Sequence, residues 1–173
     1  MQGSIMGLFA SPTGGVPKPF VEHLQVTVNG CIGDRQNDLK HHGGPRRAVC
    51  IMTSDVLEQL QAEGHPIEGG TTGENLLIAG IPRTSLDVGA VITTEDVTLR
   101  ITGDAPPCKT IKASFADGGF KSLSHKREAQ TTRWYAEVVK EGQGENISYG
   151  YGICFRMDWA IFDSNLIGSK KSY

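Results

Sequence analysis

Along most of this chain, apolar residues either alternate with polar ones or gather in short runs between glycines, prolines and acidic residues. Residues 23–34, HLQVTVNGCIGD, alternate at Leu24, Val26 and Val28, which predicts a half-buried strand that ends at the glycines. Four further segments have short apolar runs that predict strands: 47–53, 74–81, 90–102 and 151–162. The third of these is expected to contain a turn at its acidic residues.

Two segments have apolar residues at helical spacing instead. In residues 54–64, SDVLEQLQAEG, a serine or aspartate can cap the first turn and a glycine follows the last one. Residues 126–142, KREAQTTRWYAEVVKEG, place Trp134 or Tyr135 one turn before a valine, which predicts a second helix. Many short strands with two helices predict a mainly β (α+β) fold, a barrel or curled sheet with a few short helices, in a single domain over residues 1–173.

The composition is that of an ordinary soluble domain and argues against two classes of partner. Of the 173 residues, 38% are hydrophobic, and the net charge of -2 supplies no positive field for a nucleic-acid backbone. No apolar run approaches the roughly 20 residues that cross a bilayer, and the first residues lack the basic region and apolar stretch of a signal peptide. We therefore expect a cytoplasmic protein that binds neither nucleic acid nor membranes.

The four cysteines, Cys31, Cys50, Cys108 and Cys154, are widely separated and form no C-x-x-C pair. This spacing does not favour a structural zinc site, and a reducing cytoplasm disfavours disulfides, so each cysteine is judged by its own surroundings. Cys50 and Cys154 lie inside apolar runs and are interpreted as buried small hydrophobic residues. The glycines that flank Cys31 leave its role open.

Cys108 stands in a different setting, the segment GDAPPCKTIK at residues 103–112. Pro106 and Pro107 fix φ and remove two N–H donors, so the preceding strand cannot continue and the cysteine is expected at a strand end. A neighbouring cation such as Lys109 favours the thiolate, which is the form that acts as a nucleophile or a metal ligand. The flanking residues alone leave a reactive thiol and an ordinary buried cysteine equally open.

Two other loops are more polar than plain turns. Residues 33–49 gather charged residues and histidines around a glycine pair that lets the backbone approach a ligand, namely Asp34, Arg35, Asp38, Lys40, His41, His42, Gly43, Gly44, Arg46 and Arg47. Residues 69–80, GGTTGENLLIAG, place Glu74 and Asn75 before an apolar strand, where they either tie down the loop or present an acid and an amide to a ligand. The first loop is a poor metal site, because adjacent histidines on a strand point to opposite faces, and its alternative interpretation is a solvated loop.

Taken in order, the stretches GCIGDRQNDLKHHGGPRRAV, GTTGENLLIAGI and GDAPPCKTI resemble the MOSC family, named for the C-terminal domain of molybdenum cofactor sulfurase. The resemblance spans residues 28–112 and implies a β-rich, barrel-like fold. Some members are small stand-alone domains like the bacterial proteins related to those that detoxify N-hydroxylated purines. The family cysteine falls on Cys108, and the resemblance implies that it acts as a molybdenum ligand or as a sulfur carrier.

The resemblance also implies roles for the polar loops. A thiolate is a soft ligand of the kind that a molybdenum centre with sulfur donors accepts, so the molybdenum cofactor, molybdopterin, is the expected cofactor. The residues expected to hold the cofactor, several of them through its phosphate, are Arg35, Lys40, His41, Gly43, Gly44, Arg46, Asn75 and Lys109. His42 and Glu74 would orient groups or deliver protons during N–O reduction. The segment after Ile111 does not match the motifs of the resemblance and receives no role.

Four hypotheses about function remain. The first is a molybdenum-cofactor-linked oxidoreductase that reduces N-hydroxylated compounds with electrons from another protein. The second is a sulfur-carrier or cofactor-delivery module, in which a sulfur-donor protein loads a persulfide onto Cys108. The third is a hydrolase that uses Cys108 with His42, since a thiolate and a nearby base suffice for acyl transfer. The fourth is a binding domain without activity. The family resemblance favours the first two.

Overall fold

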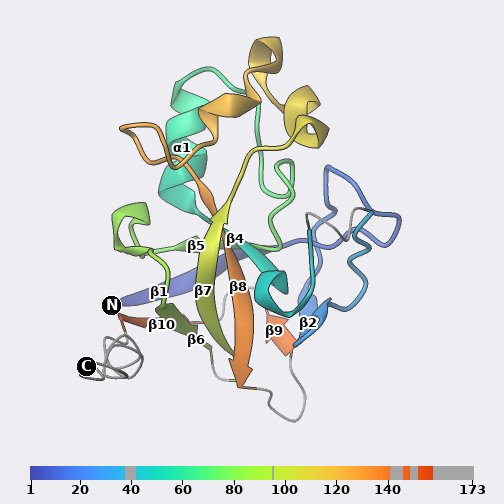
Figure 1. Ribbon diagram of the computed structural model, residues 1–173, viewed down its shortest axis with the longest axis vertical. Helices are drawn as coiled ribbons and strands as arrows, with labels where there is room; N and C mark the ends of the chain where they lie inside the picture. The colour runs from blue at the N-terminus through green and yellow to red at the C-terminus, as the bar shows by residue number, and fades with distance from the viewer. Residues whose placement is uncertain (38–41, 95, 141–145, 149–151, 158–173) are drawn as a thin grey trace, which may run out of the picture.

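Seven strands close into a barrel in the order β1-β10-β6-β7-β8-β4-β5 (Figure 1). The computed structural model describes residues 1–37, 42–94, 96–140, 146–148 and 152–157. The barrel strands are β1 (Gln2–Leu8), β4 (Val49–Thr53), β5 (Leu76–Ala79), β6 (Ala90–Thr93), β7 (Thr98–Ala105), β8 (Arg133–Lys140) and β10 (Gly152–Met157). A second, three-stranded sheet has the order β3-β2-β9 and consists of β2 (His23–Thr27), β3 (Gly30–Cys31) and β9 (Asn146–Ser148). The mainly β, barrel-like fold expected from the sequence is confirmed.

The barrel is filled by fully buried aliphatic side chains, among them Ile51, Ile78, Ile92 and Leu99, each 0% exposed. The strand pairs are antiparallel except β4 and β5, which are parallel neighbours. Parallel neighbours require a crossover connection, and α1 (Ser54–Ala62) supplies it. The predicted helix at 54–64 is thus confirmed, and it lies where the topology needs it.

A second apolar cluster joins the outside of the barrel to α1 and the chain after β7. This cluster includes Val56 and Leu60 of α1 and Ile111 and Phe115 beyond β7. Three short 3-10 helices follow β7, namely η3 (Lys109–Ser114), η4 (Ala116–Gly118) and η5 (Phe120–Ser122). Figure 1 shows them with α1 at one end of the barrel. None of the helices within the described ranges is long and apolar enough to cross a membrane.

The predicted second helix, residues 126–142, is wrong, because Arg133–Lys140 form strand β8. This strand pairs with β4 on one side and β7 on the other. Trp134, Ala136 and Val138 alternate onto the barrel core, so the segment follows a period of two as well as one of 3.6. The aromatic and β-branched residues of TTRWYAEVV favour a strand, and the neighbouring strands supply the hydrogen bonds that decide between the two patterns.

Two strand assignments also differ from the sequence interpretation. The first strand of the chain, β1, was not predicted, because Gly3 and Gly7 interrupt its apolar pattern. The alternating segment 23–34 divides into β2 and the two-residue β3, which pair as a hairpin. By contrast, β7 ends at Ala105, directly before the two prolines that were expected to stop it.

Two more short helices complete the fold. The first, η1 (Pro45–Arg47), follows Gly43 and Gly44, whose φ values of 80° and 79° lie in the region that favours glycine. The Thr102 hydroxyl of β7 donates to the Arg46 carbonyl and to the Tyr135 carbonyl, 3.2 Å away. The polar loop is therefore fixed against the end of β7 and β8. The second, η2 (Arg83–Ser85), follows β5.

Candidate functional site

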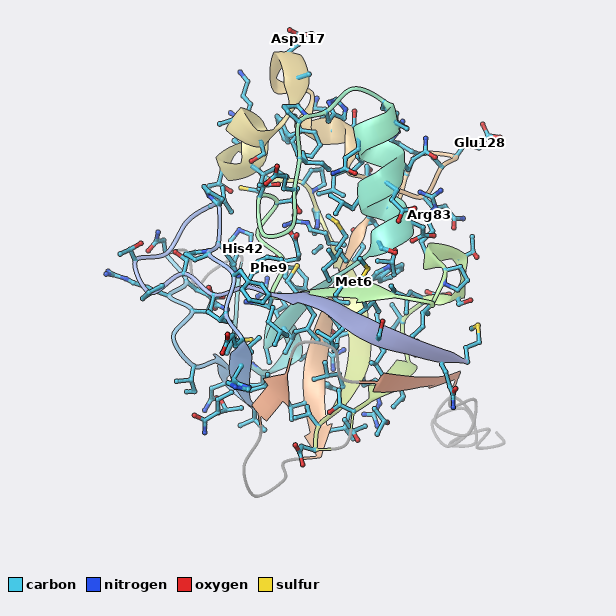
Figure 2. The ribbon with its side chains drawn as sticks, turned by 180° about the vertical axis from the view of Figure 1, so that it is seen from behind. Met6, Phe9, His42, Arg83, Asp117 and Glu128 are labelled. Atoms are coloured by element: carbon cyan, nitrogen blue, oxygen red, sulfur yellow. The ribbon has the colours of Figure 1, made fainter. Side chains whose placement is uncertain are left out.

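A cleft and a smaller pocket meet where β7 ends and the polar loops return. The cleft has a volume of about 770 Å³ and the pocket one of about 170 Å³, and both are lined by His42, Arg47, Cys108 and Tyr135. In Figure 2, His42 lies at mid-height beside the barrel, and Asp117 marks the far end of the long axis. Of the predicted site residues, Arg46 and Lys109 line the cleft, whereas Arg35, Gly43 and Asn75 line the pocket. The structure therefore brings these loops to one place.

Cys108 is partly exposed and carries a thiol that ionises readily. Its pKa is lowered from the ordinary value, chiefly because the hydroxyl and the backbone N–H of Thr110 donate hydrogen bonds to the sulfur. Desolvation by burial raises this pKa by less than either Thr110 hydrogen bond lowers it, and the Arg133 guanidinium and the Lys109 backbone N–H add smaller lowering effects. These contacts arise because the chain turns into η3 directly after Cys108. The thiolate is therefore stabilised at the junction of the two cavities.

The other described cysteines differ from Cys108 in both burial and ionisation. Cys31 is buried, its thiol donates to the Ala48 carbonyl at 3.6 Å, and burial raises its pKa to about 12. Cys50 is also buried, and burial raises its pKa as well. The interpretation of Cys50 as a buried residue is confirmed, although its side chain also lines the pocket. The side chain of Cys154 lies outside the described part of the chain.

Among the described lining residues, cations outnumber acids around both cavities. Lys18, Arg35, Arg47 and Arg133 line the pocket with Asp34, and Arg46, Arg47 and Lys109 line the cleft with Asp104. Some of this charge is neutralised within the protein, because Lys18 Nζ lies 2.6 Å from Asp34 Oδ2 and Arg46 lies 3.7 Å from Glu137. The remaining positive charge makes the site complementary to an anion.

Arg133 is the most buried of these cations, with 5% of its surface exposed. Its guanidinium donates to the carbonyl of Thr72 and, at 3.3 Å, to the carbonyl of Pro106. Within the described ranges, no carboxylate forms an ion pair with Arg133, and its buried Nε has no hydrogen-bond partner. A buried, incompletely satisfied guanidinium in the wall of a pocket is a strong anion-binding feature.

Asn75 and Glu74 are held in different ways. Asn75 is 2% exposed and accepts a hydrogen bond from the Cys50 N–H at 3.1 Å, while it donates to Asp34 Oδ2 at 2.9 Å and the Phe9 carbonyl at 3.1 Å. Glu74 is 0% exposed and accepts from the Gly70 N–H and the Thr72 hydroxyl, each at 2.6 Å. Glu74 lines neither cavity, so the structure does not bring it to the site.

His42 faces both cavities and lies 2.9 Å from the hydroxyl of Tyr135 through its Nδ1. The hydrolase hypothesis pairs His42 with Cys108, and it stays a hypothesis because the contact seen for Nδ1 is with Tyr135. Lys40 and His41 lie outside the described residues. Gly44 precedes η1 but lines neither cavity.

Sequence reasoning missed Lys18, Arg133 and Tyr135, which all line the pocket. Lys18 lies in the stretch before the first predicted strand, which carries no motif. Arg133 and Tyr135 were placed in a helix, whereas in β8 they are two residues apart and share one strand face. A search for alternation in residues 131–139 is the signal that would have found them.

Protein side chains alone do not form a metal site here. In the part of the chain that the structure describes, no group of three or more histidine, cysteine, aspartate or glutamate side chains is arranged to hold an ion. Cys108 is the single partly exposed thiol among the described cysteines.

Fold and site together define a small β-barrel protein that presents one stabilised thiolate between an open cleft and a cationic pocket. The chain belongs to the MOSC domain family, whose family model matches residues 38–153. The family resemblance drawn from the three loops is thereby confirmed, and the match extends it into β8 and beyond. The MOSC domain links the chain to molybdenum cofactor biochemistry at the level of the family.

Individual relatives agree with this assignment. The chain is 27% identical over 135 residues to the uncharacterized protein YflK of Bacillus subtilis, and it spans 59% of the length of that relative. The YuaD protein of Bacillus subtilis has a similar structure, with a TM-score of 0.70 at 18% identity over 88% of this chain and 94% of YuaD. YiiM from Escherichia coli gives a TM-score of 0.62 at 17% identity over 90% of this chain and 70% of YiiM. These likenesses establish the shared fold.

Proposed function

We propose that this protein binds the molybdenum cofactor at the junction of the cleft and the pocket, and that it reduces N-hydroxylated substrates there. The observation that carries the proposal is the Cys108 thiol, which is partly exposed and whose pKa is lowered by Thr110 and Arg133 within a cationic site. A thiolate of this kind is the ligand that a sulfur-coordinated metal accepts. Family membership supports the choice of molybdenum.

The residues of the site fit this cofactor in charge, size and ligand type. The cofactor carries a phosphate, and the incompletely satisfied Arg133 guanidinium in the pocket wall suits an anion. The cleft of about 770 Å³ is of the size that accommodates small-molecule ligands. When bound, the cofactor would supply a metal centre that passes two electrons to the N–O group. Cys108 Sγ would hold the metal, and Arg35, Arg46, Lys109 and Arg133 would hold the phosphate.

Two further features belong to the proposal. Electrons would come from a separate electron-donor protein, because the sequence shows no flavin or haem motif. The described cysteines are free thiols, which suits a reducing compartment, and we propose that the protein acts in the cytoplasm.

The test is the molybdenum content of protein purified from a host that makes molybdopterin. We expect molybdenum approaching one atom per chain in the wild type, its loss in Cys108→Ser, and its retention in Cys31→Ala, which changes a cysteine outside the site. Arg133→Gln is expected to lower the molybdenum content, with Arg83→Gln as the matched arginine control. A wild-type protein without molybdenum, or a Cys108→Ser variant that keeps it, would overturn the proposal.

A second candidate function is sulfur transfer. Cys108 has the partial exposure and the lowered pKa that an attacking thiolate needs, whether or not a metal binds. A sulfur-donor protein would add one sulfane sulfur to Cys108, and an acceptor would remove that sulfur and regenerate the thiolate. Sulfane sulfur found without molybdenum, and lost in Cys108→Ser, would favour this candidate over the reductase.

A further inference from the structure

Tyr135 and His42 form a hydrogen-bonded pair inside the candidate site. The Tyr135 hydroxyl lies 2.9 Å from His42 Nδ1, and both side chains line the cleft and the pocket together with Cys108. The sequence assigned Tyr135 no role, since it lay in a supposed helix beyond the motifs of the resemblance. Because Tyr135 contacts a titratable imidazole and lines the same cavities as Cys108, its hydroxyl is placed for proton transfer.

The backbone holds Tyr135 firmly in this place. In β8 it is opposite Cys50 of β4 on one side and Gly103 of β7 on the other. The Thr102 hydroxyl donates to the Tyr135 carbonyl at 3.2 Å and also to the loop that carries Arg46. The phenol therefore extends from a strand that is paired on both sides, so its position depends little on loop movement.

We propose that Tyr135 is a catalytic residue of the reduction proposed above, on which this inference rests, and that its hydroxyl protonates the departing oxygen of the substrate. In the overall reaction, an N-hydroxylated compound, two electrons and two protons give the amine and water. The N–O bond breaks and the oxygen takes the Tyr135 Oη proton, while the nitrogen takes the other proton from solvent. His42 Nδ1 then gives a proton to Tyr135 Oη, and His42 takes a proton from solvent, so both protons come from solvent overall. An external electron-donor protein supplies the electrons.

The acid strengths of the groups favour this direction of transfer. Burial raises the pKa of Tyr135 to about 12, so the phenol keeps its proton at neutral pH. The departing oxygen is at the level of hydroxide, whose conjugate acid, water, is a much weaker acid than a phenol, so Tyr135 is acidic enough to protonate it. The charged or titratable groups that act on Tyr135 are Cys50 and Cys108, which raise its pKa, and Arg47 and Arg133, which lower it. Others lining the two cavities are Lys18, Asp34, Arg35, Arg46, Asp104 and Lys109.

Tyr135→Phe tests the inference, since it keeps the ring and removes the hydroxyl. In molybdenum-loaded protein with reduced viologen as the electron source and an N-hydroxylated purine as the probe, we expect the rate of N–O reduction to fall by about 100-fold to 10,000-fold, the range of general acid catalysis. Molybdenum content should be unchanged, and the wild-type solvent isotope effect should disappear. His42→Gln should also slow the reaction, and the matched control is His23→Gln, which changes a histidine that lines neither cavity.

A second readout needs no cofactor. Nitrogen NMR of the unloaded protein measures the His42 imidazole directly, and Tyr135→Phe should change both its titration and its Nδ1 signal because the hydrogen bond is lost. An unchanged His42 signal, or a loaded Tyr135→Phe variant that reduces the probe at the wild-type rate, would overturn the role of Tyr135 alone. Molybdenum-loaded wild type that does not reduce the probe would overturn the proposed reductase function, and this role with it.

Discussion

Replacing Asn75 by alanine is expected to cost a large part of the stability of this protein. The Asn75 side chain makes three buried hydrogen bonds, to the Cys50 N–H, the Phe9 carbonyl and the Asp34 carboxylate. These side-chain hydrogen bonds connect three segments: β4, the residue after β1, and the polar loop. The backbone of Asn75 is also hydrogen-bonded to Phe9 and to Cys50. A buried polar group left without its partner costs about 1–3 kcal/mol. Asp34 Oδ2 keeps its hydrogen bond from Lys18 Nζ at 2.6 Å, so the Cys50 N–H and the Phe9 carbonyl are the groups that lose a partner. Two such losses predict a decrease of roughly 2–6 kcal/mol in the free energy of unfolding, out of a usual 5–15 kcal/mol.

Urea unfolding followed by tryptophan fluorescence measures this loss. With an m-value of about 2 kcal/mol/M, the midpoint should fall by roughly 1–3 M. Asn29→Ala is the matched control, because Asn29 is an exposed turn residue and its replacement should change stability by less than about 0.5 kcal/mol. A decrease below about 1 kcal/mol in Asn75→Ala would refute the reasoning, since it would mean that these hydrogen bonds do not hold the loop.

Asn75→Asp separates hydrogen bonding from size. The variant places a second carboxylate where Asn75 Nδ2 lies 2.9 Å from Asp34 Oδ2, and two carboxylates so close cannot both be ionised. The folded-state pKa of the introduced carboxyl is therefore raised above its unfolded value of about 3.9. The stability that its protonated form contributes is fully present below the unfolded pKa and is lost as pH rises through the folded-state pKa. Equal stability of wild type and variant at neutral pH would contradict this account.

Three further outcomes follow from the site and the core. Thr110→Val removes a hydrogen bond to the Cys108 sulfur, so the pKa of Cys108 should rise. Alkylation of Cys108 by iodoacetamide should therefore slow near neutral pH. A rate equal to that of wild type would argue against the stabilisation of Cys108 by Thr110. In native protein, peptide mapping should find Cys108 alkylated well before Cys31, whose pKa burial raises to about 12; equal labelling would contradict the burial difference. Leu99→Ala, at a fully buried position of β7, should lower unfolding free energy by about 2–5 kcal/mol in urea titrations; a change within about 0.5 kcal/mol would show that the barrel core repacks.

Sequence patterns located the elements whose signals are local. The helix at 54–64 has a capped, amphipathic pattern of its own, and the apolar runs that became β4, β5 and β6 are too short for helices. The end of β7 could be predicted for a covalent reason, since Pro106 and Pro107 lack N–H groups. These features do not depend on which strand lies next to which.

Features that depend on neighbouring strands could not be predicted from local sequence patterns. The apolar pattern of β1 is broken by glycines, and the strand is defined by pairing with β5 and β10. The site shows the same limit. The motif residues Cys108, Arg35 and Arg46 could be proposed from the sequence, but the side chains that complete the site come from segments without a motif. These side chains reach the site because the barrel closes, and no local sequence pattern predicts which strands then lie side by side.

The misassigned helix and the missed site residues have one cause. In a strand, residues two apart share a face, so β8 directs Arg133 and Tyr135 to the pocket and Trp134 to the core. A helix turns by about 200° over two residues, so it would have separated the same pair. Slipping β8 by one residue would exchange the two faces, burying cations and exposing the core residues. The apolar side chains that fix the register of β8 in the barrel therefore also fix the cation and the phenol beside Cys108.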